Sequence, residues 1–202
     1  QGVNHELMMS SAYFVPGPSG VVYLTGRADA GVSVSLLTNS LEATDVPAVH
    51  GGYAPYRKAL LEHGVKLYEL RRQPGAPGAG SGPHLFRRGA FRGSDSSLHS
   101  KAMIFDRTKS FIGSFNFDPR STLWNTEVGV LVDSPELAEH VRNLALEGMA
   151  PPLSYEAKLK DGNVVWVTED NGRLHTLSRE PGSWWRRFNA WFATRVGLER
   201  ML

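Results

Sequence analysis

Cysteine is absent from all 202 residues of the chain. Disulfide bridges and thiolate metal sites are therefore excluded. No apolar run reaches the roughly 18 residues needed to span a bilayer, and no signal-peptide pattern opens the chain. The first residue is Gln1 rather than Met, so we expect a processed product or a fragment.

A strong charge of either sign is also lacking. The chain has 22 basic and 20 acidic residues, a net charge of +2 and a pI of about 9.0. A domain dedicated to nucleic acid usually carries a clearer basic excess, so nucleic acid is not the favoured partner. The 41% of hydrophobic residues is typical of a globular protein, and the length suits one domain with an appendage.

What the sequence does contain is a spaced set of polar residues in one short stretch. His99, Lys101 and Asp106 read H-x-K-x4-D, and Ser114 and Asn116 follow in a G-S-x-N run. Alternation along a strand places His99 and Lys101 on one face. Phosphodiester chemistry needs an imidazole that attacks or protonates and an ammonium that neutralises phosphoryl oxygens. Ser114 and Asn116 add neutral donors to the same oxygens.

This stretch resembles the signature of the phospholipase D superfamily, H-x-K-x4-D-x6-G-S-x-N, at every signature position. Similarity to the C-terminal half of a bacterial cardiolipin synthase extends through residues 12–16, 37–40, 43–46, 115–121, 125–127 and 155–182. The type that it resembles uses phosphatidylethanolamine as the phosphatidyl donor to phosphatidylglycerol. The likeness covers nearly the whole chain.

The resemblance implies roles for further residues. Glu127, just inside the next strand, is expected to pair with His99 and hold its imidazole in one tautomer, although a plain surface Glu is the alternative. Asp106 belongs to the motif but is expected away from the phosphate, where it anchors the local fold. His50 lies in a stretch similar to cardiolipin synthases and is expected to line the lipid site.

The ends of the predicted strands supply two more candidates. Tyr13 and Asn39 end the first two strands, where ligands of α/β sheets gather, although a packed aromatic ring and a turn-forming Asn explain them equally well. The catalytic candidates are thus His99, Lys101, Asp106, Asn116 and Glu127, and the substrate-binding candidates are Ser114, Tyr13, Asn39 and His50. The histidines at positions 5, 63, 84, 140 and 175 lack partners at metal-ligand spacing, so we predict no catalytic metal and no cofactor.

The chain departs from the resemblance in one respect. Such enzymes carry two H-x-K-x4-D motifs that meet at a pseudo-twofold axis, and this sequence has one. The second is expected from a complementary half or from a second copy in a symmetric dimer. The implied mechanism passes through a phosphohistidine, and His99 resembles the acid/base of the pair more than the nucleophile.

Strands that alternate with helices predict an α/β fold with a mixed, largely parallel sheet flanked by helices. Strands are expected near residues 7–15, 32–37, 65–70, 99–105, 109–114 and 126–132, and helices near 20–29, 55–63 and 135–147. The Gly- and Pro-rich residues 73–83 are predicted to form an exposed loop. Ser19 and Ser134 are the expected N-caps, with Gly31 and Gly64 as helix stops.

Pro151-Pro152 marks a predicted boundary. Residues 1–150 are expected to form the phospholipase D-like domain, and residues 151–202 are expected to add a small antiparallel β-meander and an amphipathic C-terminal helix. Asp161-Gly162 and Asn171-Gly172 predict its two hairpin turns. Helical spacing aligns the apolar side chains at positions 184, 188, 191, 192 and 196, flanked by arginines. Such a face suits an anionic membrane surface, and docking on the chain's own domain is the alternative.

Three functions fit these observations. The first is a phosphatidyltransferase half-enzyme that acts on phosphatidylglycerol and phosphatidylethanolamine, placed peripherally at the cytoplasmic face of a bacterial inner membrane. The second is a nuclease that works as a homodimer, which the modest charge and the Trp-rich tail disfavour. The third is a non-catalytic membrane-binding module that has lost its partner half.

Overall fold

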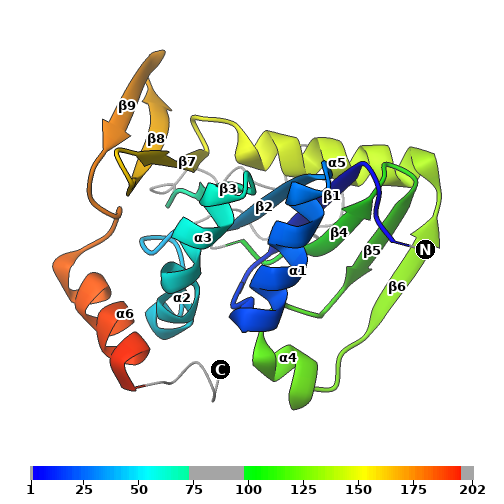
Figure 1. The fold of residues 1–202 in the computed structure, drawn as a ribbon, viewed down its shortest axis with the longest axis horizontal. Helices are drawn as coiled ribbons and strands as arrows, with labels where there is room; N and C mark the ends of the chain where they lie inside the picture. The colour runs from blue at the N-terminus through cyan, green and yellow to red at the C-terminus, as the bar shows by residue number, and fades with distance from the viewer. Residues whose placement is uncertain (1, 73–97, 197–202) are drawn as a thin grey trace, which may run out of the picture.

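A computed structural model describes residues 2–72 and 98–196 (Figure 1). Its strands are β1 (Glu6–Ser11), β2 (Ser33–Asn39), β3 (Lys66–Leu70), β4 (Lys101–Phe105), β5 (Lys109–Gly113), β6 (Gly129–Asp133), β7 (Ser154–Lys160), β8 (Asn163–Asp170) and β9 (Arg173–Leu177). Its helices are α1 (Gly17–Asp29), α2 (Pro47–Tyr53), the 3-10 turn η1 (Ala54–Tyr56), α3 (Arg57–Glu62), α4 (Pro119–Leu123), α5 (Pro135–Met149) and α6 (Trp184–Val196).

The strands form one mixed sheet in the order β6-β5-β4-β1-β2-β3-β7-β8-β9. The predicted α/β fold with a mixed sheet flanked by helices is confirmed. Its parallel part is smaller than expected, because only the β1–β2 and β2–β3 pairs are parallel. These are the strands joined by helical crossovers, whereas the short connections β4–β5, β7–β8 and β8–β9 permit only antiparallel pairing.

The core has two layers because successive side chains of β1 and β2 point to opposite faces of the sheet. On one face, Leu7, Met9 and Leu36 pack with Leu24 of α1 and Leu60 of α3. On the other face, a second cluster is built with α5, and it contains Met8, Leu37, Ile104, Ala138 and Ala145. Helices α1 and α3 therefore cover one side of the sheet, and α5 covers the other (Figure 1).

Several predicted boundaries agree with the structure. The Ser134 hydroxyl accepts from the N–H of Leu137 at the start of α5. The turns Asp161-Gly162 and Asn171-Gly172 have positive φ at both residues, as tight hairpins require. Helix α1 differs, since it begins at Gly17 with Pro16 at its N-cap, and no side chain caps it. The proline at the second helical position fixes a helical φ, so the helix starts before Ser19.

The predicted meander, β7 to β9, continues the main sheet, because β7 pairs with β3. The helices α2 and α4 were not predicted; both are short, and α2 contains Gly51-Gly52, which lowers helix propensity. The expected loop over residues 73–83 and His84 lie outside the described residues. Within residues 2–72 and 98–196, no helix combines the length and apolarity required for a bilayer span.

Candidate functional site

The candidate site lies at one edge of the sheet, where β4 begins and β1 and β5 end. Lys101, the first residue of β4, pairs with Ser11, the last residue of β1. Strand β5 runs antiparallel to β4 and ends at Gly113, so Ser114 and Asn116 follow at the same edge. The topology therefore brings the lysine and the G-S-x-N residues of the motif together.

Lys101 is half-buried, and its Nζ donates to the carbonyl oxygen of His99 at 3.0 Å. Burial lowers the pKa of Lys101, and the carboxylates of Glu127 and Asp118 oppose that change. A cation with one main-chain acceptor retains donors for the oxygens of a phosphate.

His99 presents an exposed imidazole, with 73% of its side-chain surface accessible. Its Nε2 lies 3.9 Å from Oδ2 of Asp45, a separation too long for a hydrogen bond but short enough for charge interaction. Asp45 was not among the predicted site residues. It follows β2, and its place beyond the carboxyl end of a parallel strand is the signal that would have identified it.

The carboxylate of Glu127 binds Ser114 rather than the motif histidine. The Ser114 hydroxyl donates to Glu127 Oε2, and Asn125 Nδ2 donates to Oε1 at 3.4 Å. These hydrogen bonds, led by that of Ser114, lower the pKa of Glu127. The expected pairing of Glu127 with His99 is not formed in the described structure, where the carboxylate binds Ser114 and Asn125 instead.

The main chain of Asn116 is fixed by a hydrogen bond, whereas its side-chain oxygen has no hydrogen-bond partner among the described residues. Its N–H donates to the Ser121 hydroxyl at 3.3 Å, and Asp118 caps α4 by accepting from the N–H of Ser121 at 2.8 Å. Burial raises the pKa of Asp118. The Oδ1 of Asn116 is buried and has no hydrogen-bond partner among the described residues. An unpaired buried acceptor costs about 1–3 kcal/mol, so a ligand or solvent donor at this point is favoured.

Three predicted substrate-binding residues meet around one small cavity beyond the ends of β1 and β2. Tyr13, Asn39 and His50 all line it. Tyr13 is half-buried; burial raises its pKa, and the nearby charges of Asp45 and Asp118 add to this effect. The Tyr13 hydroxyl therefore remains a hydrogen-bond donor close to Asp45, the carboxylate that faces His99.

The side chain of Asn39 is also bound to the main chain at both ends of its amide. Its Nδ2 donates to the carbonyl oxygens of Ala12 and Leu98 at 3.0 and 3.2 Å, and its Oδ1 accepts from the N–H of Leu98 at 2.7 Å. Both ends of the amide are therefore bound to main chain. Asn39 fixes the residue directly before His99, so it is a positioning residue.

Asp106 lies at the far end of β4, roughly 16 Å along the strand from Lys101 at the usual rise per residue. Its carboxylate accepts from the N–H groups of Asn4, His5 and Glu6, at 2.7 to 3.2 Å. Burial alone would raise its pKa, and these N–H donors hold the pKa below its ordinary value. Asp106 anchors the start of β1 to β4, as the resemblance implied.

His50 belongs to a buried ion-pair cluster. Its Nε2 lies 2.6 Å from Oε1 of Glu180, and Arg57 contacts both groups through Nη2. Arg57 Nε also pairs with Oε1 of Glu69 at 2.7 Å, while Trp166 Nε1 donates to Oε2 at 2.9 Å. His50, which was predicted to line the lipid site, thus links α2 to Glu180 in the C-terminal part of the chain.

The ligand atoms of His50, Glu69 and Glu180 lie within 4.8 Å of one another, a spacing that a metal ion could use. The guanidinium of Arg57 already supplies the positive charge at this point. Burial would raise the pKa of Glu180, but Arg57 and His50 hold that pKa at about 2. Arg57 therefore lies at the centre of the cluster, between the carboxylates of Glu69 and Glu180.

Together, the mixed sheet and the His-Lys-Asn edge define a domain of the phospholipase D class. The chain belongs to the family described as cardiolipin synthase, PLD-like domain, whose model matches residues 3–147. It is 39% identical to cardiolipin synthase C of Escherichia coli (strain K12) over 194 residues, which is 95% of this chain and 40% of that protein. The chain is 27% identical to cardiolipin synthase B of Salmonella typhi over 138 residues, which is 68% of this chain and 27% of that protein.

Solved structures show the same fold. The phospholipase D family member Nuc from Salmonella typhimurium superposes with a TM-score of 0.56 at 18% identity, over 78% of this chain and 85% of that chain. The predicted membership of the phospholipase D superfamily and the likeness to a bacterial cardiolipin synthase are confirmed. The chain spans about two fifths of the length of cardiolipin synthase C.

Proposed function

We propose that this chain supplies one catalytic half of a cardiolipin synthase-like phosphatidyltransferase, with phosphatidylethanolamine as donor and phosphatidylglycerol as acceptor, and without a metal or cofactor. The observation that carries the proposal is the edge of the sheet where Lys101, Ser114 and Asn116 meet beside the exposed His99. The 39% identity to cardiolipin synthase C supports the lipid substrates.

The reaction proceeds in two steps. The imidazole nitrogen of one histidine forms a bond to phosphorus, the bond to the ethanolamine oxygen breaks, and the opposing imidazolium gives its proton to that oxygen. The opposing imidazole then removes the proton of the phosphatidylglycerol hydroxyl, whose oxygen displaces the histidine from phosphorus. His99 acts as the acid/base, Lys101 neutralises the phosphoryl oxygens, and Asn116 and Ser114 orient them.

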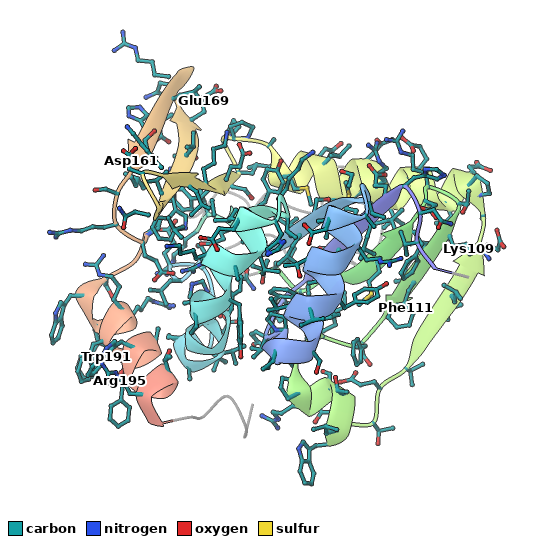
Figure 2. The ribbon with its side chains drawn as sticks, in the orientation of Figure 1. Lys109, Phe111, Asp161, Glu169, Trp191 and Arg195 are labelled. Atoms are coloured by element: carbon teal, nitrogen blue, oxygen red, sulfur yellow. The ribbon has the colours of Figure 1, made fainter. Side chains whose placement is uncertain are left out.

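The second histidine comes from another domain of the same class, either a second copy of this chain or a complementary half. The sheet face that carries Lys101 also carries Met103, in register with Phe111 and Leu131 on the next two strands. Leu131 is 64% exposed, and the ring of Phe111, labelled in Figure 2, lies over Gly129. Met103 itself packs against the core, so the exposed Leu131 is the accessible apolar part of this face, and it favours the approach of a second domain there.

Lipid is preferred to nucleic acid because an apolar groove adjoins the site. It lies between the starts of α1 and α4 and is lined by Val15, Phe115, Phe117 and Leu123, among others. Such a surface suits acyl or glycerol carbons, whereas a nucleic-acid strand calls for a basic groove. With phospholipid as its substrate, the protein belongs peripherally at the cytoplasmic face of a bacterial inner membrane.

The test is transfer chemistry by the purified chain at rising protein concentration. Mixed micelles of phosphatidylglycerol and phosphatidylethanolamine should yield cardiolipin and free ethanolamine in equal amounts, with a specific activity that increases with protein concentration. His99→Ala is the control for contaminating enzymes. Cleavage of single-stranded DNA without cardiolipin would instead identify the nuclease, and inactivity toward both at all concentrations and with a complementary half would identify a binding module.

A further inference from the structure

Helix α6 has two faces with different tasks. Its inner face carries small side chains that pack closely on α2, and Ala190 and Ala193 are buried there. A Cβ added to Gly51 would lie only 2.3 Å from the carbonyl oxygen of Ala190, and the Thr194 hydroxyl donates to the carbonyl oxygen of Gly51 at 2.8 Å. The helix is therefore docked on its own domain.

The outer face of α6 is a continuous aromatic surface. Its exposed members are Trp184, Trp185, Phe188, Trp191 and Phe192. Their rings stack along the helix, with centroid separations of 5.6 to 6.3 Å from Phe188 to the other four. Trp191 points away from the domain in Figure 2 and is 54% exposed. The side chain of Val196 and residues 197–202 lie outside the described part of the chain.

The arginines of α6 divide between the two faces. Arg186 Nη1 donates to the carbonyl oxygens of Leu41 and Thr44, and Arg187 Nη1 donates to those of Glu180 and Gly182. These two guanidiniums fix the helix, contrary to the expectation that all its arginines flank a membrane face. Arg195 lies over the ring of Trp191, 5.5 Å from its centroid. Helix α6 has no acidic residue, so its charged side chains are the three arginines at positions 186, 187 and 195.

The hydrogen bonds of Arg186 connect α6 to the site. Thr44 directly precedes Asp45, whose carboxylate lies 3.9 Å from the imidazole of His99. The same short segment after β2 is thus held by the tail on one side and faces the motif on the other. A surface that engages α6 is therefore held in a fixed position relative to His99.

We propose that the outward aromatic face of α6 is the docking surface for an anionic phospholipid bilayer, held in register with the site by Arg186. Tryptophan and phenylalanine side chains suit the headgroup boundary, and a helix without acidic residues complements anionic lipid. The helix lies on the surface, since no described helix is suited to span it. That the bilayer also supplies the substrate rests on the proposed function, whereas the docking of α6 on the bilayer does not.

The test is sedimentation of the full chain with vesicles of phosphatidylglycerol and phosphatidylcholine, compared with phosphatidylcholine alone. The chain should prefer the anionic vesicles, and added salt should weaken the preference. The double variant Trp191→Ala/Phe192→Ala should bind about tenfold more weakly or worse, because two apolar side chains lose their insertion. Trp124→Ala is the matched control, since Trp124 is an exposed tryptophan outside α6; its binding should equal that of the wild type.

Catalysis is assayed separately on a soluble short-chain phospholipid. Vesicle binding of the double variant at the wild-type level would overturn the proposal, whatever the catalytic result. A double variant that changes from dimer to monomer, while vesicle binding stays at the wild-type level, would identify the face as a protein interface. If vesicle binding depends on α6 but the chain has no transfer activity, the docking surface is supported and only the proposed function is refuted.

Discussion

Two histidines on either side of the segment that follows β2 have opposite surroundings. His50 has 3% of its side-chain surface exposed and lies 2.6 Å from Glu180, inside a buried cluster centred on Arg57. His99 is 73% exposed and lies 3.9 Å from Asp45. The same residue types, imidazole beside carboxylate and cation, thus build a closed structural joint in one place and an open reactive edge in the other.

The difference separates stability from activity. Removal of one partner of a closed ion pair destabilises the fold, because it leaves the other charge buried and uncompensated. The open edge is exposed and should contribute little to folding, and under the proposed function its groups would bind phosphate and face a second histidine. Substitutions in the two regions should therefore affect different measurements, and four predictions test that separation.

The largest effect is expected for His99→Ala in the active assembly. Loss of an acid/base group typically costs about a hundred- to ten-thousand-fold in turnover, and loss of a nucleophile costs more. The urea midpoint should stay at the wild-type value because His99 is exposed. Lys101→Ala should do similar harm, and Lys101→Arg should rescue it only in part, since a planar fork does not replace a compact ammonium. Normal turnover in purified His99→Ala would refute the assignment of the site.

The next effect concerns the closed joint. Arg57→Met should destabilise the fold by about 3–5 kcal/mol, because the buried carboxylate of Glu69 loses its cation. Urea unfolding followed by circular dichroism measures this loss. The neighbouring Lys58→Met removes an exposed partner of Glu62 and should change stability by about 0–1 kcal/mol. Equal effects of the two substitutions would remove the distinction between closed and open regions.

Acid should destabilise the fold through the closed joint. The pKa of Glu180 falls from 4.5 to about 2 on folding, so its stabilising charge is complete above the unfolded value and is lost as the pH drops from about 4.5 to about 2. The loss should be on the order of 3 kcal/mol. Unfolding free energies across this window measure it, and Glu180→Gln should show a flatter pH dependence. An identical slope in the variant would contradict the assignment.

The smallest effect sharpens the description of the open edge. Lys101 is charged below its pKa, and the carboxylate of Glu127 supports that charge. Glu127→Gln should therefore lower the pKa of Lys101 further, because the negative charge that supports the ammonium is lost. NMR titration of labelled lysines follows it, with Lys101→Arg to assign the signal. Glu62→Gln, remote from the edge, should leave the titration unchanged.

The open edge was largely predictable from the sequence, and the closed joint was not. Strand alternation and motif spacing suffice to place Lys101, Ser114 and Asn116 together, because all lie within one hairpin and its exit. His50 and Glu180 are 130 positions apart, and nothing local in the chain indicates that they pair. Asn39 was recognised as a strand end, but its partner Leu98 lies 59 positions away.

Helix α2 shows why a local pattern also fails. Its two glycines predict no helix, yet Gly51 is required because the backbone of Ala190 occupies the place of a side chain. The helix thus depends on the docking of α6, which sequence periodicity along residues 47–53 does not contain. The start of α1 at Gly17 was likewise set by Pro18 rather than by the expected serine cap.

The hydrogen bonds on either side of residues 73–97 have a consequence for the position of His99. Before this stretch, the N–H of Arg72 donates to Glu42, and after it Asn39 binds both main-chain groups of Leu98. The two ends are thus held by residues outside the stretch, so a change of its length need not shift His99.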